Sequence, residues 1–353
     1  MEFRIIFGFA ALMGAACLEA MGQTAPIVNR IGYTFPARAN LTPGQLVTLF
    51  VTGIPLGRNH RATEGTDLET TMSGISVGMS QYALQEFVAW RLPILEVRSL
   101  QTCFNAVFGI ECLPPMAAVT VQVPFEMETT ELCPSFCFSS APSFDVRLDG
   151  VGLFVMEAAP FPDQVHILRA FDSVLPIMAI AGQCFRGTRN GNMGPQNLTG
   201  LPCPPIVKHG DGSLVTAANP AKAGVELVAH TVGLGRTSPA SETGRVVRTS
   251  APTITKFAMD FNYRPNALGT RPPPVDTPGV ATPVYTGTLE GSVGLYEVRF
   301  VVPPVPQGTP PCASLQNVNG LPRDNVVYSN LTFSVGGRSS FDGAGICVAV
   351  EEE

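Results

Sequence analysis

The chain has 353 residues, of which 35 are Gly and 32 are Pro, and only 14% are Asp, Glu, Lys or Arg. Long surface helices need charged faces and few Gly or Pro, so an all-α or coiled-coil protein is excluded, and the hydrophobic content of 45% argues against general disorder. The net charge of −6 and the absence of any block of Lys or Arg argue against nucleic acid or an anionic membrane as a partner.

Residues 1–22 have the pattern of a secretory signal peptide. Arg4 precedes an apolar run over residues 5–18, and Ala20 and Gly22 supply the small side chains of a cleavage site. A lipoprotein signal with Cys17 as the lipidated residue is the alternative. No later stretch reaches the roughly 18 apolar residues of a membrane helix, so no transmembrane anchor is expected after signal removal. We therefore expect a secreted, cell-surface or periplasmic protein.

One sequence pattern occurs twice in the chain, first over residues 39–57 and again over residues 218–235. Each copy has two Gly nine residues apart, and each is followed at almost the same distance by a hydrophobic run that ends in Pro. Chance rarely preserves two such separations together, so we interpret the chain as two copies of one unit. The matching positions are Gly44 and Gly224, Gly53 and Gly233, and Pro124 and Pro303.

Each copy is rich in short apolar or alternating runs bounded by Gly and Pro, which is typical of strands. We expect strands over residues 46–51, 119–123, 144–150, 225–230, 296–301 and 331–337. The expected fold is all-β, with two tandem Ig-like β-sandwiches over residues 23–162 and 163–353. The best candidate for a helix is residues 81–89.

The segment between the two copies has no counterpart in the first. Residues 165–168 and 174–180 have strand-like composition, and residues 182–205 resemble a loop flanked by two cysteines. We expect this insertion to decorate the second sandwich. The Pro-rich residues 271–283 favour an extended crossover within the second unit over a linker.

Eight cysteines remain after removal of the leader that contains Cys17, and an even number in an oxidising compartment suggests disulfides. Structural zinc is not expected, because the close pair of cysteines at 133 and 137 has no second pair or nearby His. Eight cysteines allow about 105 connectivities, so the pairing stays open. A nearest-neighbour scheme would join Cys103 to Cys112, Cys133 to Cys137, Cys184 to Cys203 and Cys312 to Cys347.

Three stretches of the second copy together resemble a known family. They are residues 209–224 (HGDGSLVTAANPAKAG), residues 231–239 (TVGLGRTSP) and residues 294–303 (GLYEVRFVVP). This combination is similar to an uncharacterised repeated domain of secreted Acidobacteria proteins. The resemblance implies a bacterial, extracellular pair of Ig-like sandwiches and brings no catalytic residues. The chain departs from the family pattern at Val225, where a Glu is usual, and in the cysteine-flanked insertion.

The sequence contains no phosphate-binding loop, dinucleotide fingerprint, zinc-protease motif or nucleophile elbow. No catalytic, cofactor-binding or metal-binding residue is therefore predicted, and no cofactor. The four histidines, His60, His166, His209 and His230, are scattered along the chain, so a site assembled in space stays open.

Each remaining polar or aromatic candidate has a simple structural interpretation. We interpret His230 as an ordinary strand residue and Asp211 as part of a turn. Asp211 and Asp342 are isolated carboxylates, whereas calcium sites usually gather several. Trp90 is expected in the core, and few other aromatic residues are available for a sugar-binding surface.

The function expected from these patterns is an exported, non-enzymatic structural, adhesive or interaction module. Its partner would be an extracellular protein or a polysaccharide. The alternative is a secreted hydrolase, with its site at the domain junction or under the insertion between residues 184 and 203.

Overall fold

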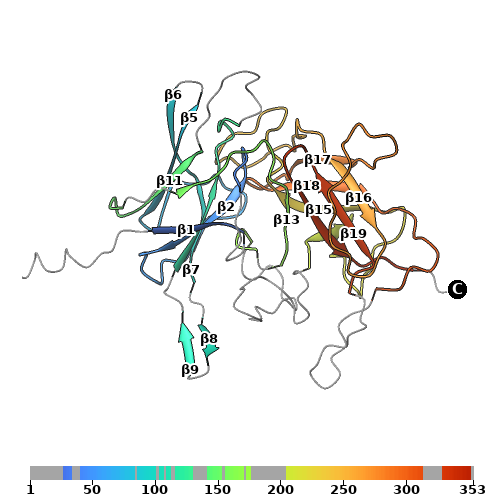
Figure 1. The fold of residues 1–353 in the computed structure, drawn as a ribbon. Helices are drawn as coiled ribbons and strands as arrows, with labels where there is room; N and C mark the ends of the chain where they lie inside the picture. The colour runs from blue at the N-terminus through green and yellow to red at the C-terminus, as the bar shows by residue number, and fades with distance from the viewer. Residues whose placement is uncertain are drawn as a thin grey trace, which may run out of the picture.

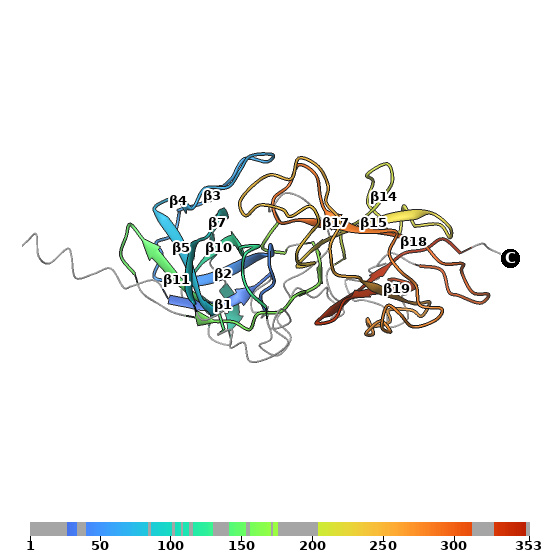
Figure 2. The same cartoon turned by 90° about the horizontal axis from the view of Figure 1, so that it is seen from above.

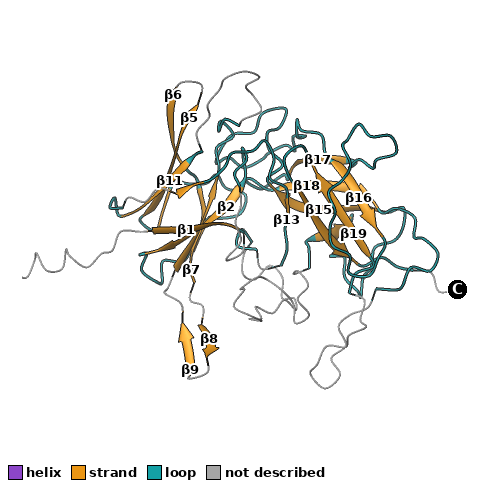
Figure 3. Cartoon of the chain, in the orientation of Figure 1, coloured by secondary structure: helices purple, strands orange, loops and turns teal. Residues whose placement is uncertain are grey.

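A computed structural model describes residues 27–33, 40–83, 86–100, 103–106, 109–112, 116–129, 141–152, 156–170, 172–175, 204–312 and 328–350. This part of the chain is all-β, as expected, and it contains no helix (Figure 3). It therefore has no helix long and apolar enough to cross a membrane. The expected signal peptide at residues 1–22 lies outside the described residues.

The first unit, residues 27–157, consists of two larger antiparallel sheets and the separate hairpin of β8 (Cys103–Ala106) and β9 (Gly109–Cys112) (Figure 1). Both sheets bring together strands that are far apart in the sequence. The first has the order β1 (Ile27–Gly32), β2 (Leu46–Thr52), β10 (Met116–Gln122), β7 (Ile94–Leu100) and β3 (His60–Arg61). The second has the order β12 (Met156–Glu157), β11 (Ser143–Leu148), β5 (Ile75–Ala83) and β4 (Thr71–Met72), and β6 (Glu86–Arg91) also pairs with β5.

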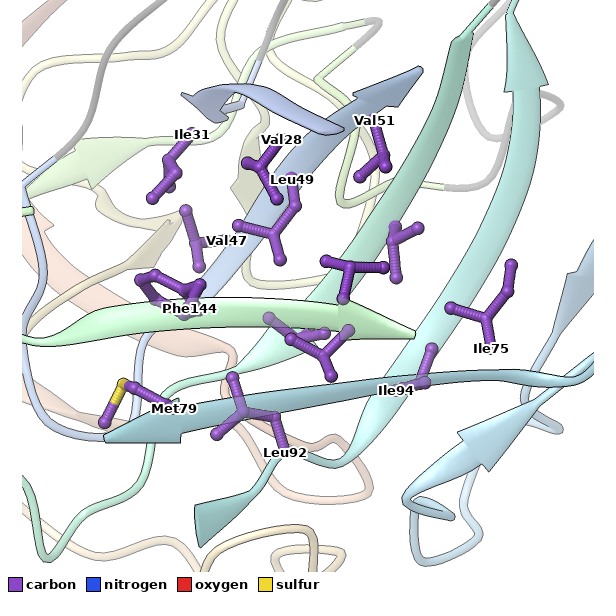
Figure 4. Packing of buried hydrophobic residues seen from close by; sticks show 14 of the residues in the cluster. Val28, Ile31, Val47, Leu49, Val51, Ile75, Met79, Leu92, Ile94 and Phe144 are labelled. Carbon is purple, nitrogen blue, oxygen red and sulfur yellow. The ribbon is translucent and has the colours of Figure 1, made fainter. Parts of the chain in front are cut away.

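The core of the first unit lies between these two sheets (Figure 4). The inward positions of β5 and β11 alternate with polar outward ones, which is the pattern of a sheet with one face in water. Ile75, Met79 and Phe144 pack from the second sheet against Val47 and Leu49 of β2. Burial of these aliphatic and aromatic side chains supplies the main stabilisation of the unit.

The second unit, residues 166–346, repeats this arrangement with two further sheets. The first has the order β13 (His166–Ile167), β15 (Glu226–Val232), β18 (Tyr296–Val301) and β17 (Tyr285–Thr288), and β14 (Val207–His209) also pairs with β15. The second has the order β16 (Ala258–Asn262), β19 (Leu331–Gly336) and β20 (Phe341–Ile346). Its own core joins residues of both sheets.

The backbone makes the same turn at the matching Gly44 and Gly224 of the two copies. The amide of Gly44 donates to the carbonyl of Val123 at 3.1 Å, and the amide of Gly224 donates to that of Val302 at 2.8 Å. Both Gly have a φ near +77°, at 76° and 78°, a left-handed conformation that favours Gly. The paired hydrophobic runs therefore start from the same turn in both copies.

The strand order repeats as well. β2 pairs with β10 in the first unit and β15 pairs with β18 in the second, each antiparallel. β11 and β19 then take equivalent places in the opposite sheets. All six strands expected from the repeat are thus present, each within a few residues of its expected bounds.

The expected helix over residues 81–89 is wrong. This stretch spans the hairpin of β5 and β6, in which Tyr82 lies opposite Phe87 and Met79 lies opposite Trp90. Residues 86–91 alternate between more exposed and half-buried positions, a period of two that does not fit a helix. Trp90 is half-buried against the first core.

Two other expected strands are shorter than predicted. The stretch at residues 165–168 contains the two-residue β13, while Val174 and Leu175 lie in a turn and residues 176–180 lie outside the described residues. The last strand, β20, ends at Ile346, and Val348 beyond it forms a parallel bridge with Ala221.

The two units lie side by side (Figure 2), and a third apolar cluster lies between them. This cluster joins Tyr33 and Leu46 of the first unit to Val232 of the second and to Leu168 and Val174 of the connecting segment. In addition, Phe125 of the first unit packs within the second core. The junction is therefore an apolar contact and not only a linker.

Candidate functional site

The structure brings one histidine and two carboxylates together at the junction of the two units. His166, at the start of β13, has its Nε2 atom 2.7 Å from Asp172 Oδ2 and its Nδ1 atom 3.3 Å from Asp342 Oδ2. The side chain of Asp172 is only 1% exposed, and that of His166 18%. Both ring nitrogens therefore face a carboxylate.

Arg169 places a second cationic side chain beside this group, next to Asp342. Its Nη2 atom lies 3.1 Å from Asp342 Oδ1 and also donates to the carbonyl of Gly343 at 2.6 Å. Its backbone amide donates to Asp172 at 2.8 Å. We call His166, Arg169, Asp172, Asp342 and the adjoining Tyr33 the junction cluster.

Tyr33 links the junction cluster to the first unit. It directly follows β1, and its ring stacks on the imidazole of His166 with a centroid separation of 4.1 Å and an interplanar angle of 3°. The hydroxyl of Tyr33 accepts a hydrogen bond from the side-chain amide of Gln45, and its carbonyl accepts one from the hydroxyl of Ser173. The junction cluster thus joins β1 of one unit to β13 and β20 of the other.

The surroundings of His166 favour its charged form. Burial alone would lower the pKa, but the charges and hydrogen bonds of Asp172 and Asp342 outweigh it and raise the pKa of His166 to about 9. Burial likewise opposes the ionised form of Asp342, yet hydrogen bonding to His166 and the charge of Arg169 hold the pKa of Asp342 below its usual range. At neutral pH the junction cluster is therefore an imidazolium between two carboxylates.

This arrangement is poorly suited to general-base catalysis. A general base needs an unprotonated nitrogen directed at a nucleophile or water, whereas both nitrogens of His166 donate to carboxylates. The hydroxyl closest in sequence, that of Ser173, donates to the carbonyl of Tyr33. The geometry instead fits an ionic contact that fixes one unit against the other.

The remaining histidines do not belong to the junction cluster, although the carbonyl of His230 accepts a hydrogen bond from the amide of Leu168 at 2.9 Å. His60 belongs to β3, and His230 belongs to β15, where burial and then the charge of Lys208 lower its pKa to about 4. His209 ends β14, and the neighbouring Asp211 accepts hydrogen bonds from the amide and hydroxyl of Ser213. The turn expected at Asp211 is therefore confirmed.

The expected disulfide between Cys312 and Cys347 is present, with a Cα separation of 5.3 Å. Cys103 and Cys112 lie opposite each other as register partners of β8 (Cys103–Ala106) and β9 (Gly109–Cys112). Cys133, Cys137, Cys184 and Cys203 lie outside the described residues, and their pairing stays a prediction. In the described ranges no group of three or more His, Cys, Asp or Glu side chains is arranged to hold a metal ion.

The sequence did not predict the junction cluster. His166 and Asp172 are close in the chain, but Asp342 comes from the last strand, and only the packing of β13 beside β20 brings it near. Comparison with known proteins adds nothing to this geometry, because no family model, curated protein or solved structure matches the chain.

Proposed function

We propose that the protein is an exported, non-enzymatic interaction module made of two Ig-like sandwiches held at a fixed angle. The observation that carries the proposal is the junction cluster, in which both nitrogens of His166 are engaged by carboxylates. The group that most resembles a catalytic site therefore serves to join the two units.

A second set of contacts supports a fixed arrangement of the two units. Asp67 of the first unit accepts hydrogen bonds from Arg245 at 2.6 Å and from the amide of Val246 at 2.9 Å. Close by, the side chain of Gln122 accepts a hydrogen bond from the amide of Gly244 at 2.6 Å. Two separate regions of contact restrain rotation between the units more than one would.

The export of the protein rests on the pattern of residues 1–22 and on the even number of cysteines in the remaining chain. The disulfide between Cys312 and Cys347 supports an oxidising compartment. The resemblance to the repeated Acidobacteria domain supports the same assignment. Export predicts a mature protein that begins at Gln23, and intact-mass measurement on secreted material tests it, since an acylated terminus at Cys17 would contradict it.

The test against the alternative, a hydrolase, uses the mature protein with its disulfides formed. It is incubated with chromogenic esters, peptides, glycosides and phosphoesters, in parallel with the variants His166→Gln and His60→Gln. We expect no turnover above buffer for any of the three. Turnover that is abolished in H166Q and kept in H60Q would establish a hydrolase and overturn the proposal.

A further inference from the structure

An exposed aromatic pair stands on the outer side of the β5–β6 hairpin, at the upper end of the first unit (Figure 1). Phe87 is 70% exposed and Tyr82 is 47% exposed. The two residues are direct partners across the hairpin, so their side chains leave the sheet on the same face. Adjoining exposed apolar side chains mark interaction surfaces more often than scattered single ones do.

The side chains next to this pair are short. Along the same face, Ser80 lies opposite Ala89 on one side and Ser143 on the other, and the hydroxyls of the two serines are 3.0 Å apart. The next position of β5 on this face, Gly78, is buried, and a Cβ there would overlap the carboxylate of Asp145. Ser80, Ala89 and Ser143 thus form a strip of short side chains beside the rings.

The far end of the strip carries paired charges. Arg147 Nε donates to Asp145 Oδ2 at 2.9 Å, and Arg91 lies opposite Gly78 with its guanidinium 3.4 Å from the hydroxyl of Ser76. Glu157 lies opposite Ser143 and adds a second negative charge. The two Arg and the two acids on this face balance, although the whole chain has a net charge of −6.

The opposite face of the same strands is anchored. Met79 and Gln81 are 1% exposed, and the side chain of Gln81 exchanges two hydrogen bonds with the backbone of Glu128, at 2.9 and 3.1 Å. Trp90 packs against the first core. The backbone that carries the aromatic pair is therefore held by packing on the reverse side, so little backbone entropy is lost on binding.

We propose that this outer face, from Tyr82 and Phe87 to Arg91 and Arg147, binds a neutral polysaccharide. The inference rests on the proposed role as an interaction module and names its partner. Aromatic rings pack on the apolar faces of sugar rings, and the hydroxyls and charged groups of the strip offer donors and acceptors for sugar hydroxyls. Four residues of strand from Phe87 to Arg91 span about 13 Å, which suits several linked sugars better than one.

The charges and composition of the face distinguish this ligand from others. An anionic polymer requires an excess of cations, whereas the charges here sum to zero. The centre of a protein interface is depleted in charge and rich in large apolar side chains, whereas this strip is made of Ala and Ser beside an ion pair. A neutral polymer with many hydroxyls is complementary to both properties.

The experiment is native affinity electrophoresis of the mature protein in gels that contain hydroxyethylcellulose, xylan, galactomannan, dextran or glycol chitin, and in gels that contain alginate as an acidic control. The variants are Phe87→Ala, Tyr82→Ala and Ala89→Arg, which blocks the strip but leaves the rings. The control is Leu268→Ala, at a side chain that is 76% exposed in the second unit. Thermal melts confirm that each variant folds.

We expect retardation by at least one neutral polysaccharide, a dissociation constant raised about tenfold or more in F87A, Y82A and A89R, and no change in L268A. Retardation by none of the neutral polymers, retardation by alginate alone, or full binding by folded F87A and A89R would overturn the inference. Release of reducing ends from a bound polymer would instead overturn the non-enzymatic role and leave the binding face in place.

Discussion

At the scale of single residues, the junction cluster shows how the neighbours of a histidine decide its role. The residues around His166 are of the types found in many catalytic sites, namely two carboxylates and a nearby serine. Because each ring nitrogen already donates to a carboxylate, the same residues provide a charged contact. The sequence could not predict this, since no local pattern joins His166 to Asp342.

The raised pKa of His166 predicts that stability falls at alkaline pH. Its folded pKa of about 9 exceeds the ordinary value of 6.5, so its contribution is complete below pH 6.5 and is lost as the pH rises through 9. The difference in unfolding free energy between the wild type and His166→Gln should shrink by roughly 3 kcal/mol between pH 6 and pH 9.5. Urea unfolding at both pH values measures it.

The control for this prediction is Leu268→Ala, a change at an exposed side chain that carries no titratable group. Its difference from the wild type should stay constant over the same range. A constant difference for H166Q as well would mean that His166 is neutral in the folded protein, which would remove the ionic interpretation of the junction cluster.

Two glycines of the second copy predict a graded response to substitution. Gly224 and Gly233 have φ angles of +78° and +79°, so Ala at either position costs about 1–2 kcal/mol of backbone strain. A Cβ at Gly233 would also overlap the backbone carbonyl of Gln164, whereas a Cβ at Gly224 meets nothing within 4 Å. Thermal melts should therefore show a larger loss, by about 1–3 kcal/mol, for Gly233→Ala. Equal losses would contradict the close approach of Gln164.

At the scale of elements, strands were predictable where short runs of apolar or alternating residues are bounded by Gly or Pro. β2 and β10, which are buried at nearly every position, and β15 and β18 follow directly from such runs. The β5–β6 hairpin was not predictable in this way, because residues 86–91 are exposed or half-buried, and the mixture of polar and apolar residues over 81–91 fits more than one period. The exposed aromatic pair was missed for the same reason.

The end of the chain gives a prediction about the disulfide. Cys347 follows β20, and the side chain of Asn330 bonds the backbone of Val348 at 2.8 Å through both its amide and its carbonyl oxygen. The bond to Cys312 closes a segment with a sequence separation of 35, which predicts about 3–4 kcal/mol of stabilisation.

We therefore expect Cys347→Ser to lower the melting temperature about as much as Cys312→Ser, and the double variant to lower it no further. Calorimetry of the oxidised proteins measures this, and non-reducing peptide mapping checks the bond together with the pairing of Cys103 and Cys112. A disulfide between cysteines of the first and second copies would contradict the nearest-neighbour scheme.

At the scale of the whole molecule, the repeat predicted two similar units but not their contact. Each unit has its own core, yet a third apolar cluster and Phe125 cross the boundary. The sequence repeat predicts the structure that the two copies share. It does not predict the contact between them, because that contact depends on residues that differ between the copies. Phe125 directly follows Pro124, the last residue of the shared pattern in the first copy, and has Pro304 at the matching position of the second copy.

Phe125 is the residue of the first unit on which the second core depends most directly. It is 9% exposed and packs among residues of the second unit. Its amide donates a hydrogen bond to the hydroxyl oxygen of Thr243 at 2.9 Å, and its carbonyl accepts one from Arg236 Nε at 3.1 Å. Truncation to Ala removes a large aromatic group from a packed interior and leaves a cavity between the units.

We predict that Phe125→Ala lowers the unfolding free energy by about 3–5 kcal/mol, whereas Phe87→Ala, at an exposed position, changes it by less than about 0.5 kcal/mol.

A fragment from Asp163 onward should still melt cooperatively, because it retains the other residues of the second core, but at a lower temperature than the full chain. Calorimetry of the two variants and the fragment measures all three quantities. If the fragment aggregates or melts without a cooperative transition, the two units share one core. Residue 162 would then separate the two sequence copies but not two independently folding units. If instead F125A is as stable as F87A, the second core closes without Phe125, and the junction cluster alone holds the units together.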